Sequence, residues 1–240
     1  MKSRINYIKL LFLLLMSSVM LLISCNKELS YEQPTKDGLG SLYNFQGNNN
    51  DVFGDNDGIG SNIKYVNAGS NKKNQVLSLN GFSSYVKFPD SFDYEVKTIN
   101  LWFKVIKPTT VLGVVYSSDN PDLNYGLTLL NTQLINSHLN LYFNVSNQQD
   151  TIAIKANTWY NATIATEGKK YSYCLNGNSV KSGEFKNYIS SYNGYPATII
   201  GCDRTLNGRF FNGLVDDLRI YNRKLSDHEI KVLYQVKFGI

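Results

Sequence analysis

Residues 211–223 read FNGLVDDLRIYNR, and this stretch near the C-terminus decides the fold. The pattern over residues 210–221 predicts a β-strand, in which successive side chains point to opposite faces. One face then carries Leu214, Asp216, Leu218 and Ile220. The other face carries Val215, Asp217, Arg219 and Tyr221. We therefore expect Asp216 to lie among aliphatic side chains, where a carboxylate must be paired, hydrogen-bonded or bound to a metal.

Strand-like runs recur along the rest of the chain, separated by turn-forming residues. The clearest is Thr98–Val105 (TINLWFKV), whose odd-numbered residues are all apolar. Further runs lie at residues 42–46, 76–79, 85–88, 111–117, 125–130, 139–145, 159–166, 170–175 and 197–201. Asn176-Gly177 follows one of them and is typical of a type I′ hairpin turn. Many short strands with turns between them predict an all-β sandwich of two antiparallel sheets.

One helix is predicted, close to the C-terminus. Ser226-Asp227-His228-Glu229 fits a capping box, in which the Ser226 hydroxyl accepts from the Glu229 amide and the Glu229 side chain reaches back. Ile230, Leu233 and Tyr234 then form one apolar stripe. We expect a short C-terminal helix that docks on the sandwich.

The first 25 residues predict a secretory signal that ends at a cysteine. Basic residues precede an apolar run at residues 10–22, which is short for a membrane span, and Ser24 stands directly before Cys25. This arrangement resembles the lipobox of bacterial lipoproteins, which implies cleavage before Cys25 and acylation of that residue. The alternative is a cleaved signal that happens to precede a cysteine. We expect residues 1–24 to be a lipoprotein signal peptide, residues 25–37 a lipidated tether and residues 38–240 the folded domain.

The charge balance changes once the signal is removed. Of the 24 basic residues three leave with the signal, so 21 remain against 19 acidic residues, and they form no basic cluster. Nucleic acid is therefore not an expected partner. Cys174 and Cys202 remain, and the sequence leaves open whether they form a disulfide or stay as buried thiols.

Several segments, in their order along the chain, resemble the bacterial laminin G-like domain of the concanavalin A-like lectin/glucanase superfamily. Residues 43–47 (YNFQG) resemble its opening strand, and residues 79–86 its FDG…YV element, with Asn80 where Asp is usual. Residues 98–103 and 175–177 resemble its TISAWV strand and YVNG hairpin, and residues 211–230 its closing run. The resemblance covers residues 38–235 and implies a two-sheet jelly roll. It does not imply catalysis, because this fold carries lectins, adhesins and enzymes alike.

The resemblance also implies a structural calcium ion. Domains similar to this one hold calcium between the early acidic loop and the Asp of the closing strand. Residues 51–62 (DVFGDNDGIGSN) supply hard oxygen donors and glycines, which suit calcium. The expected donors are Asp51, Asp57 and Asp216, with Asp55 and Asp217 in reserve. The alternative is that Asp216 accepts backbone amides and that the loop is simply solvated.

No sequence pattern for catalysis is present. Retaining glucanases of this fold carry a Glu-x-Asp-x-Glu strand, and the nearest match, Asp93-Tyr94-Glu95, has Lys97 in the third acidic position. We therefore expect no catalytic residues and no enzyme. Aromatic side chains suit a sugar-binding surface instead, although aromatic residues also favour strands for packing. The ligand-binding candidates are Tyr188, Tyr192, Tyr195, Tyr125 and Trp102, whereas Trp159 is assigned to the core.

The expected function is that of a non-catalytic carbohydrate-binding lipoprotein, accessory to polysaccharide capture. Its expected location is extracytoplasmic, lipid-anchored to a bacterial membrane, at the outer membrane or cell surface. The expected partners are a carbohydrate or protein ligand and the membrane. The alternative is a protein-binding adhesin or envelope-complex subunit of the same fold, and a glycoside hydrolase is a third, less favoured reading.

Overall fold

The computed structural model describes residues 32–68, 75–89, 98–108, 113–118, 127–135, 138–145, 148–184, 198–203 and 206–235. The predicted signal peptide and Cys25 lie outside these residues. Within the described part, no helix combines the length and the apolar character needed to cross a bilayer.

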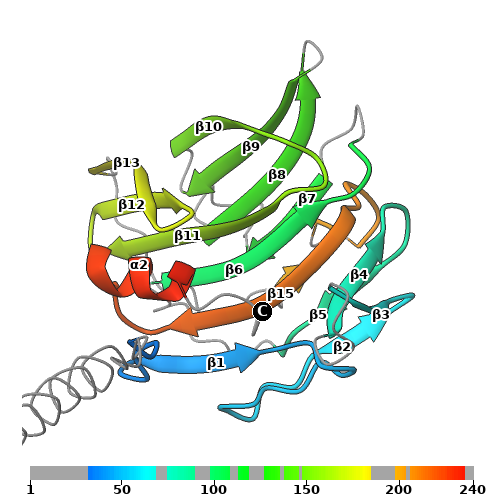
Figure 1. The fold of residues 1–240 in the computed structure, drawn as a ribbon, viewed down its shortest axis with the longest axis horizontal. Helices are drawn as coiled ribbons and strands as arrows, with labels where there is room; N and C mark the ends of the chain where they lie inside the picture. Colours follow the sequence, from blue (N-terminus) through cyan, green and yellow to red (C-terminus); the bar gives the residue numbers. More distant parts are fainter. Residues whose placement is uncertain are drawn as a thin grey trace, which may run out of the picture. The chain divides into compact units, whose positions relative to one another are not determined.

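Two antiparallel sheets and one C-terminal helix form the domain (Figure 1). The helix-bearing sheet contains β1 (Leu39–Tyr43), β3 (Lys64–Asn67), β4 (Gln75–Asn80), β6 (Thr98–Val105), β11 (Trp159–Glu167), β12 (Lys170–Leu175), β13 (Asn178–Glu184) and β15 (Asn212–Tyr221). Its order is β13-β12-β11-β6-β15-β4-β3, and β1 also pairs with β15. The opposite sheet contains β2 (Ile59–Ser61), β5 (Tyr85–Lys87), β7 (Gly113–Ser118), β8 (Leu127–Ile135), β9 (His138–Val145), β10 (Gln148–Ile154) and β14 (Ile199–Ile200), in the order β10-β9-β8-β7-β14-β5-β2. The predicted all-β, two-sheet jelly-roll sandwich is confirmed.

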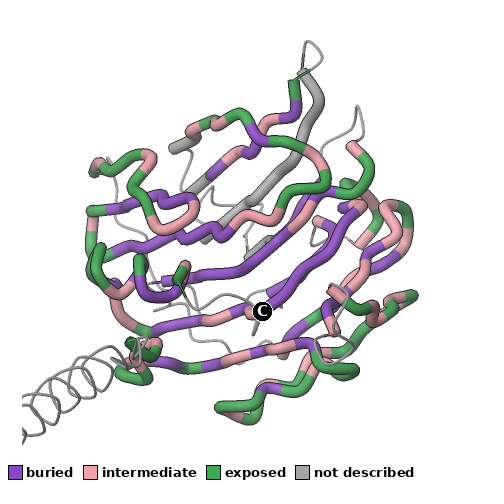
Figure 2. The backbone as a smooth tube through the Cα atoms, viewed as in Figure 1, coloured by how far each residue is buried: buried purple, intermediate pink, exposed green. Residues whose placement is uncertain are grey.

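The main core lies between the two sheets. On β6 the inward side chains are Ile99, Leu101, Phe103 and Val105, as the alternation predicted. The intervening residues of β6 are also largely buried, because the C-terminal helix covers part of the other face of this sheet. Figure 2 shows the consequence: β6 and β15 are buried along most of their length, whereas β13 at the sheet edge is exposed or half-buried.

Strand prediction succeeded where a strand has a buried face and failed at the edges. The predicted runs Thr98–Val105 and Lys170–Leu175 coincide with β6 and β12. The missed strands are β2, β3, β10 and β13. Edge strands such as β13 (NSVKSGE) bury little surface, so they need no apolar alternation. The first strand was predicted at residues 42–46 but spans Leu39–Tyr43, and Phe45 beyond it adopts a positive φ of 48°.

The predicted hairpin turn and helix are both present. Asn176 and Gly177 have φ angles of 53° and 73°, as a type I′ turn requires, and join β12 to β13. The helix, α2 (Asp227–Gln235), begins directly after Ser226. The Glu229 amide donates to Ser226 Oγ at 3.3 Å, and the Ser226 amide donates to Glu229 Oε2 at 2.8 Å. This reciprocal pair is the predicted capping box.

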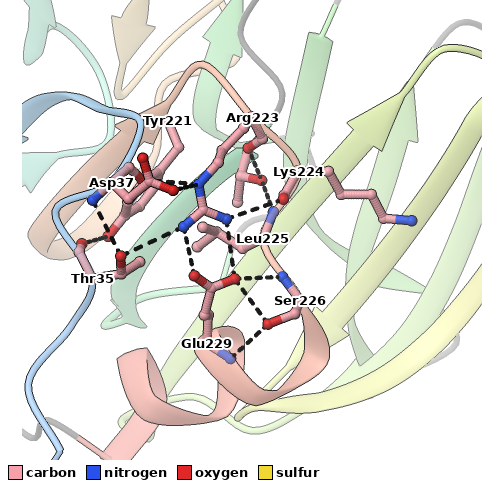
Figure 3. Close-up of polar contacts among 9 residues, drawn as sticks. Thr35, Asp37, Tyr221, Arg223, Lys224, Leu225, Ser226 and Glu229 are labelled. Carbon is pink, nitrogen blue, oxygen red and sulfur yellow. Dashed lines mark hydrogen bonds and ion pairs between the residues drawn. The ribbon is translucent and has the colours of Figure 1, made fainter.

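A polar cluster around Arg223 joins the start of the domain to the N-terminal end of α2 (Figure 3). The Arg223 guanidinium forms an ion pair with Glu229, with Nη2 and Oε1 at 2.5 Å, and its Nε donates to the backbone oxygen of Asp37 at 3.0 Å. Hydrogen bonding to Arg223, above all, lowers the pKa of Glu229 to about 2. Tyr221 Oη donates to the backbone oxygen of Thr35 at 3.1 Å. The compact unit accordingly begins at Pro34, a few residues before the predicted boundary at residue 38.

The two cysteines of the domain are separate buried thiols. Cys174 lies on β12, while Cys202 follows β14 of the opposite sheet. Burial is the main cause that raises the pKa of Cys174 to about 11 and that of Cys202 to about 12. Both thiols therefore stay protonated at neutral pH, as small core residues do.

Candidate functional site

A β-bulge in β15 overturns the predicted distribution of its side chains. The register with β6 pairs Asp216 with Trp102 but then jumps to pair Arg219 with Asn100, and Asp217 inside the jump has a φ of 46°. An extra residue in one strand reverses the facing of all residues beyond it. Leu218 and Ile220 therefore point into the main core. Leu214 and Asp216, before the bulge, and Arg219, after it, lie on the face of the sheet that α2 covers in part. The four residues that were expected on one face, Leu214, Asp216, Leu218 and Ile220, are therefore divided between the two faces of the sheet.

Asp216 is buried, as expected, but beside Trp102 rather than among the aliphatic residues of the main core. Its side chain is 4% exposed, and Oδ1 accepts the Asp217 amide at 2.9 Å. Burial, followed by the nearby charge of Asp217, raises the pKa of Asp216 to about 8. The carboxyl group is therefore mostly protonated at neutral pH. Asp217 forms a different contact, an ion pair with Arg219 in which Oδ1 and Nε are 2.9 Å apart.

The acidic loop is held together by backbone amides. Asp51 Oδ1 accepts the amides of Leu42 and Phe53 at 2.9 and 3.1 Å. Asp51 itself donates its amide to Asp57 Oδ1 at 2.8 Å. Burial favours the neutral Asp51 carboxyl, but the amide hydrogen bonds outweigh it and lower the pKa of Asp51. Asp51 thus acts as an ionised cap that fixes the loop against β1.

The predicted set of three calcium donors does not come together. Asp51 lies along one edge of β1, since the Leu42 amide points to it and the Val52 amide donates to the Leu42 oxygen. The other edge of β1 pairs with β15. Asp216 lies on β15 beyond the residues that pair with β1, and it is opposite Trp102 of β6. Among the described residues no group of three acidic, His or Cys side chains is arranged to hold a metal.

Calcium itself stays a prediction, with donors on the loop side of β1. Asp57 is exposed there, and Asn49 Oδ1 is buried without a hydrogen-bond partner. A bound ion stabilises the folded state, so EDTA should lower the Tm of the protein. The same EDTA shift is expected in Asp216→Asn and a smaller one in Asp57→Asn, measured by differential scanning fluorimetry. An unchanged Tm of the native protein would contradict calcium binding, and a shift lost only in Asp216→Asn would contradict the donor placement.

Trp102 is a packing residue and not the ligand contact that was predicted. Its side chain is 5% exposed. Its ring stacks on Tyr234 of α2, with centroids 5.6 Å apart and an interplanar angle of 21°. A sugar cannot reach a ring that is covered in this way. Tyr125, Tyr188, Tyr192 and Tyr195 lie outside the described residues.

Buried amides continue the helix-side face next to Trp102. Asn100 Nδ2 donates to Asn161 Oδ1 at 2.8 Å and to Thr163 Oγ1 at 2.6 Å, while Asn161 Nδ2 returns a bond to Asn100 Oδ1 at 3.1 Å. The Asn161 amide donates to Asn176 Oδ1 at 2.9 Å. These bonds fix β6, β11 and the Asn176-Gly177 turn relative to one another. They make the adjoining surface rigid.

Trp159 lies on this surface, which corrects its assignment to the core. The register places Trp159 opposite Lys104, and its strand neighbour Tyr160 points inward onto Phe103 instead. Trp159 is half-buried, and Lys104 Nζ lies 5.1 Å from the centroid of its ring. A sequence signal was available, because Trp159 shares its face of the strand with the polar residues Asn161 and Thr163.

Helix α2 contacts the β12–β13 hairpin (Figure 1). A Cβ atom on Gly177 would lie only 3.0 Å from Tyr234 Cβ and 3.3 Å from Lys231 Cα, so this turn and the helix are in close contact. Tyr234 is half-buried and Lys231 is exposed. We call Lys104 and Trp159, which are in contact, the Trp159 patch, and Gly177, Lys231 and Tyr234 lie on the same side of the sheet. Its chemistry is that of an aromatic surface with positive charge at its border.

The comparisons with known proteins bear on the fold. A family model described as the concanavalin A-like lectin/glucanases superfamily matches residues 80–231. Domain 4 of AbnA, a GH43 extracellular arabinanase from Geobacillus stearothermophilus solved with arabinotriose, is 20% identical, with a TM-score of 0.62 over 85% of this chain and 100% of that chain. No curated protein matches.

Binding domains of botulinum neurotoxins are also similar in structure. The serotype D domain is 14% identical, with a TM-score of 0.59 over 84% of this chain and 52% of that one. The domain of neurotoxin DC, solved with SialylT, is 17% identical, with a TM-score of 0.58 over 83% of this chain and 51% of that one. The present chain thus spans about half the length of these binding domains, and identities this low establish a shared fold.

Proposed function

Because the chain belongs to the concanavalin A-like lectin/glucanases superfamily, we propose that it is a non-catalytic carbohydrate-binding protein. The observation that carries this proposal is the half-buried Trp159 on a rigid sheet face, bordered by Lys104. An indole offers a flat apolar surface to the C–H face of a pyranose and buries a large area when it is covered. The neighbouring lysine can donate hydrogen bonds to sugar oxygens.

The rigidity of the patch favours a binding role. Strands β6 and β11 meet there, and buried amide hydrogen bonds further along these strands fix them to each other and to the Asn176-Gly177 turn. A preorganised surface loses little conformational entropy when a ligand binds, so more of the contact energy appears as affinity. The structural relative from the arabinanase was solved with arabinotriose, which is consistent with a glycan ligand for a domain of this fold.

The proposal includes attachment to the cell envelope through an acylated Cys25. Acyl chains contribute about 0.8 kcal/mol per buried methylene, so several of them hold a protein on a membrane without a spanning segment. The eight residues 26–33 between Cys25 and the compact unit would reach roughly 28 Å when extended. A domain on such a tether can capture polysaccharide close to the membrane. Radiolabelled palmitate incorporation that is lost in Cys25→Ala tests this anchor.

Replacing Trp159 by alanine should weaken glycan binding at least tenfold, or about 1.4 kcal/mol, because the stacking surface is removed. Its Tm should change little, since Trp159 is only half-buried. The full-length protein in detergent would be screened on a glycan array, and hits measured by isothermal titration calorimetry.

Tyr142→Ala is the matched control for this substitution. Tyr142 is also a half-buried aromatic residue, but it lies on β9 of the opposite sheet, on the side away from the main core. Unchanged binding in Tyr142→Ala is expected. Loss of binding in Tyr142→Ala alone would place the site on the opposite sheet. Absence of all glycan binding, together with capture of a purified envelope protein, would favour the adhesin alternative.

A further inference from the structure

Lys104 carries a positive charge that is not paired with an acidic side chain in the part of the chain that the structure describes. Its cross-strand neighbours on the helix-bearing sheet are Trp159 on β11 and Leu214 on β15. The ion pairs of the described residues do not include it. Asp216, on the same face of β15, is opposite Trp102 in the register and accepts a hydrogen bond from the Asp217 amide. The ammonium group instead lies over the indole of Trp159.

A second lysine lies on the same side of the sheet, on α2. Lys231 precedes Tyr234 by three residues on α2, so both side chains lie on neighbouring positions of one helix face. The contacts of both residues with the Gly177 turn place Lys231 on the same side of the sheet as Trp159. Lys231 is exposed, and it forms no ion pair among the described residues.

We propose that the Trp159 patch is selective for acidic sugars, that is, for glycans bearing a carboxylate or a sulfate ester. This inference rests on the proposed carbohydrate-binding function and specifies its ligand class. The pyranose ring lies against the exposed part of the indole, and the anionic substituent pairs with the Lys104 ammonium. Lys231, on the same side of the sheet, adds longer-range attraction.

The physical reason is the pairing of a lysine with an aromatic surface. A hydrogen bond between an ammonium and an anionic oxygen is shorter and stronger than one between neutral groups. Where the ring and the sugar exclude part of the water, this difference grows because screening is reduced. Without its signal the chain has only two more basic than acidic residues. General attraction to polyanions is therefore weak, and a preference for acidic glycans must come from a local site.

The test uses the full-length protein in detergent and three polysaccharides: polygalacturonate with carboxylates, a sulfated galactan, and neutral arabinan. Affinity electrophoresis and isothermal titration calorimetry measure binding at two salt concentrations. At low salt the native protein should bind at least one acidic polymer tenfold more tightly than arabinan. Raising the salt should reduce this preference. Comparison of polygalacturonate with the sulfated galactan identifies whether a carboxylate or a sulfate ester is bound.

Lys104→Gln should abolish the preference, because it should weaken binding of the acidic polymer far more than binding of arabinan, and Lys104→Arg should retain most of the preference. Lys64→Gln is the control, since Lys64 is an exposed lysine on the edge strand β3. Equal losses in Lys104→Gln and Lys64→Gln would overturn the inference, because they indicate general charge attraction. Binding of arabinan as tight as that of acidic polymers would overturn it as well but leave the carbohydrate function intact. A lack of binding to every glycan would overturn both.

Discussion

Replacing Trp102 by alanine should lower the free energy of unfolding by about 3–5 kcal/mol, the range for deleting a large buried aromatic side chain. Trp102 is 5% exposed and stacks on Tyr234. Its removal leaves a cavity under α2 and weakens the docking of the helix, whose Ile230 and Leu233 are buried in the same layer of side chains. For a domain of this size the Tm should fall by roughly 10 °C. Thermal and urea unfolding followed by circular dichroism would measure the loss.

Trp159→Ala provides the comparison, since both variants delete a tryptophan from the same face of neighbouring strands. Because Trp159 is half-buried, its removal should cost less than about 1.5 kcal/mol. Trp102→Phe should recover part of the stability, because it restores a stacking partner for Tyr234. The interpretation of Trp102 as a packing residue is wrong if Trp102→Ala keeps its Tm but loses glycan binding.

Replacing Asp216 by asparagine should make the protein more stable at pH 8 by several kcal/mol and leave it nearly unchanged at pH 4. Burial raises the pKa of Asp216 to about 8 in the folded state, against an ordinary value of 3.8. Below pH 4 the Asp216 carboxyl is protonated in both the folded and the unfolded state, so Asp216 costs the wild-type protein no stability. Between pH 4 and pH 8 the unfolded chain loses this proton first, and folded stability falls by about 1.4 kcal/mol per pH unit. Above pH 8 both states are ionised and the loss of stability, about 6 kcal/mol at most, is complete.

Asparagine cannot ionise, and its Oδ1 can still accept the Asp217 amide that Asp216 accepts. Urea unfolding at pH 4, 6 and 8 would give the free energies of both proteins. Glu184→Gln serves as the control, because it also replaces a carboxylate by an amide but at an exposed position on the edge strand β13. A wild-type stability that increases from pH 4 to pH 8 relative to Asp216→Asn would contradict a neutral Asp216. It would indicate an ionised carboxylate with a cationic partner.

Local features of this protein could be predicted from the sequence, because they depend on residues close together in the chain. The alternation of Thr98–Val105 gives β6 and its inward face directly. The capping box at Ser226 and Glu229 gives the start of α2, and Asn176-Gly177 gives the turn after β12. Each of these requires only the conformational preferences of a few successive residues.

The candidate site could not be predicted in the same way. Trp159 and Lys104 are 55 positions apart in the sequence, and only the register of β11 on β6 makes them neighbours. Trp102 was predicted to contact a ligand because the strand pattern indicates on which face of the sheet a side chain lies. The pattern does not indicate which element packs on that face, and in the structure Tyr234 of α2 covers Trp102.

The sequence by itself determined the sandwich, most of its strands, the hairpin turn and the capped helix, since apolar alternation and turn chemistry act over short distances. Tertiary structure alone decided the environment of the charged and aromatic side chains. One bulge at Asp217 turned the end of β15 over, and strand pairing placed Asp216 opposite Trp102 rather than in a group of metal ligands with Asp51 and Asp57. Such outcomes follow from long-range strand pairing, in which a shift of one residue exchanges the two faces of a sheet.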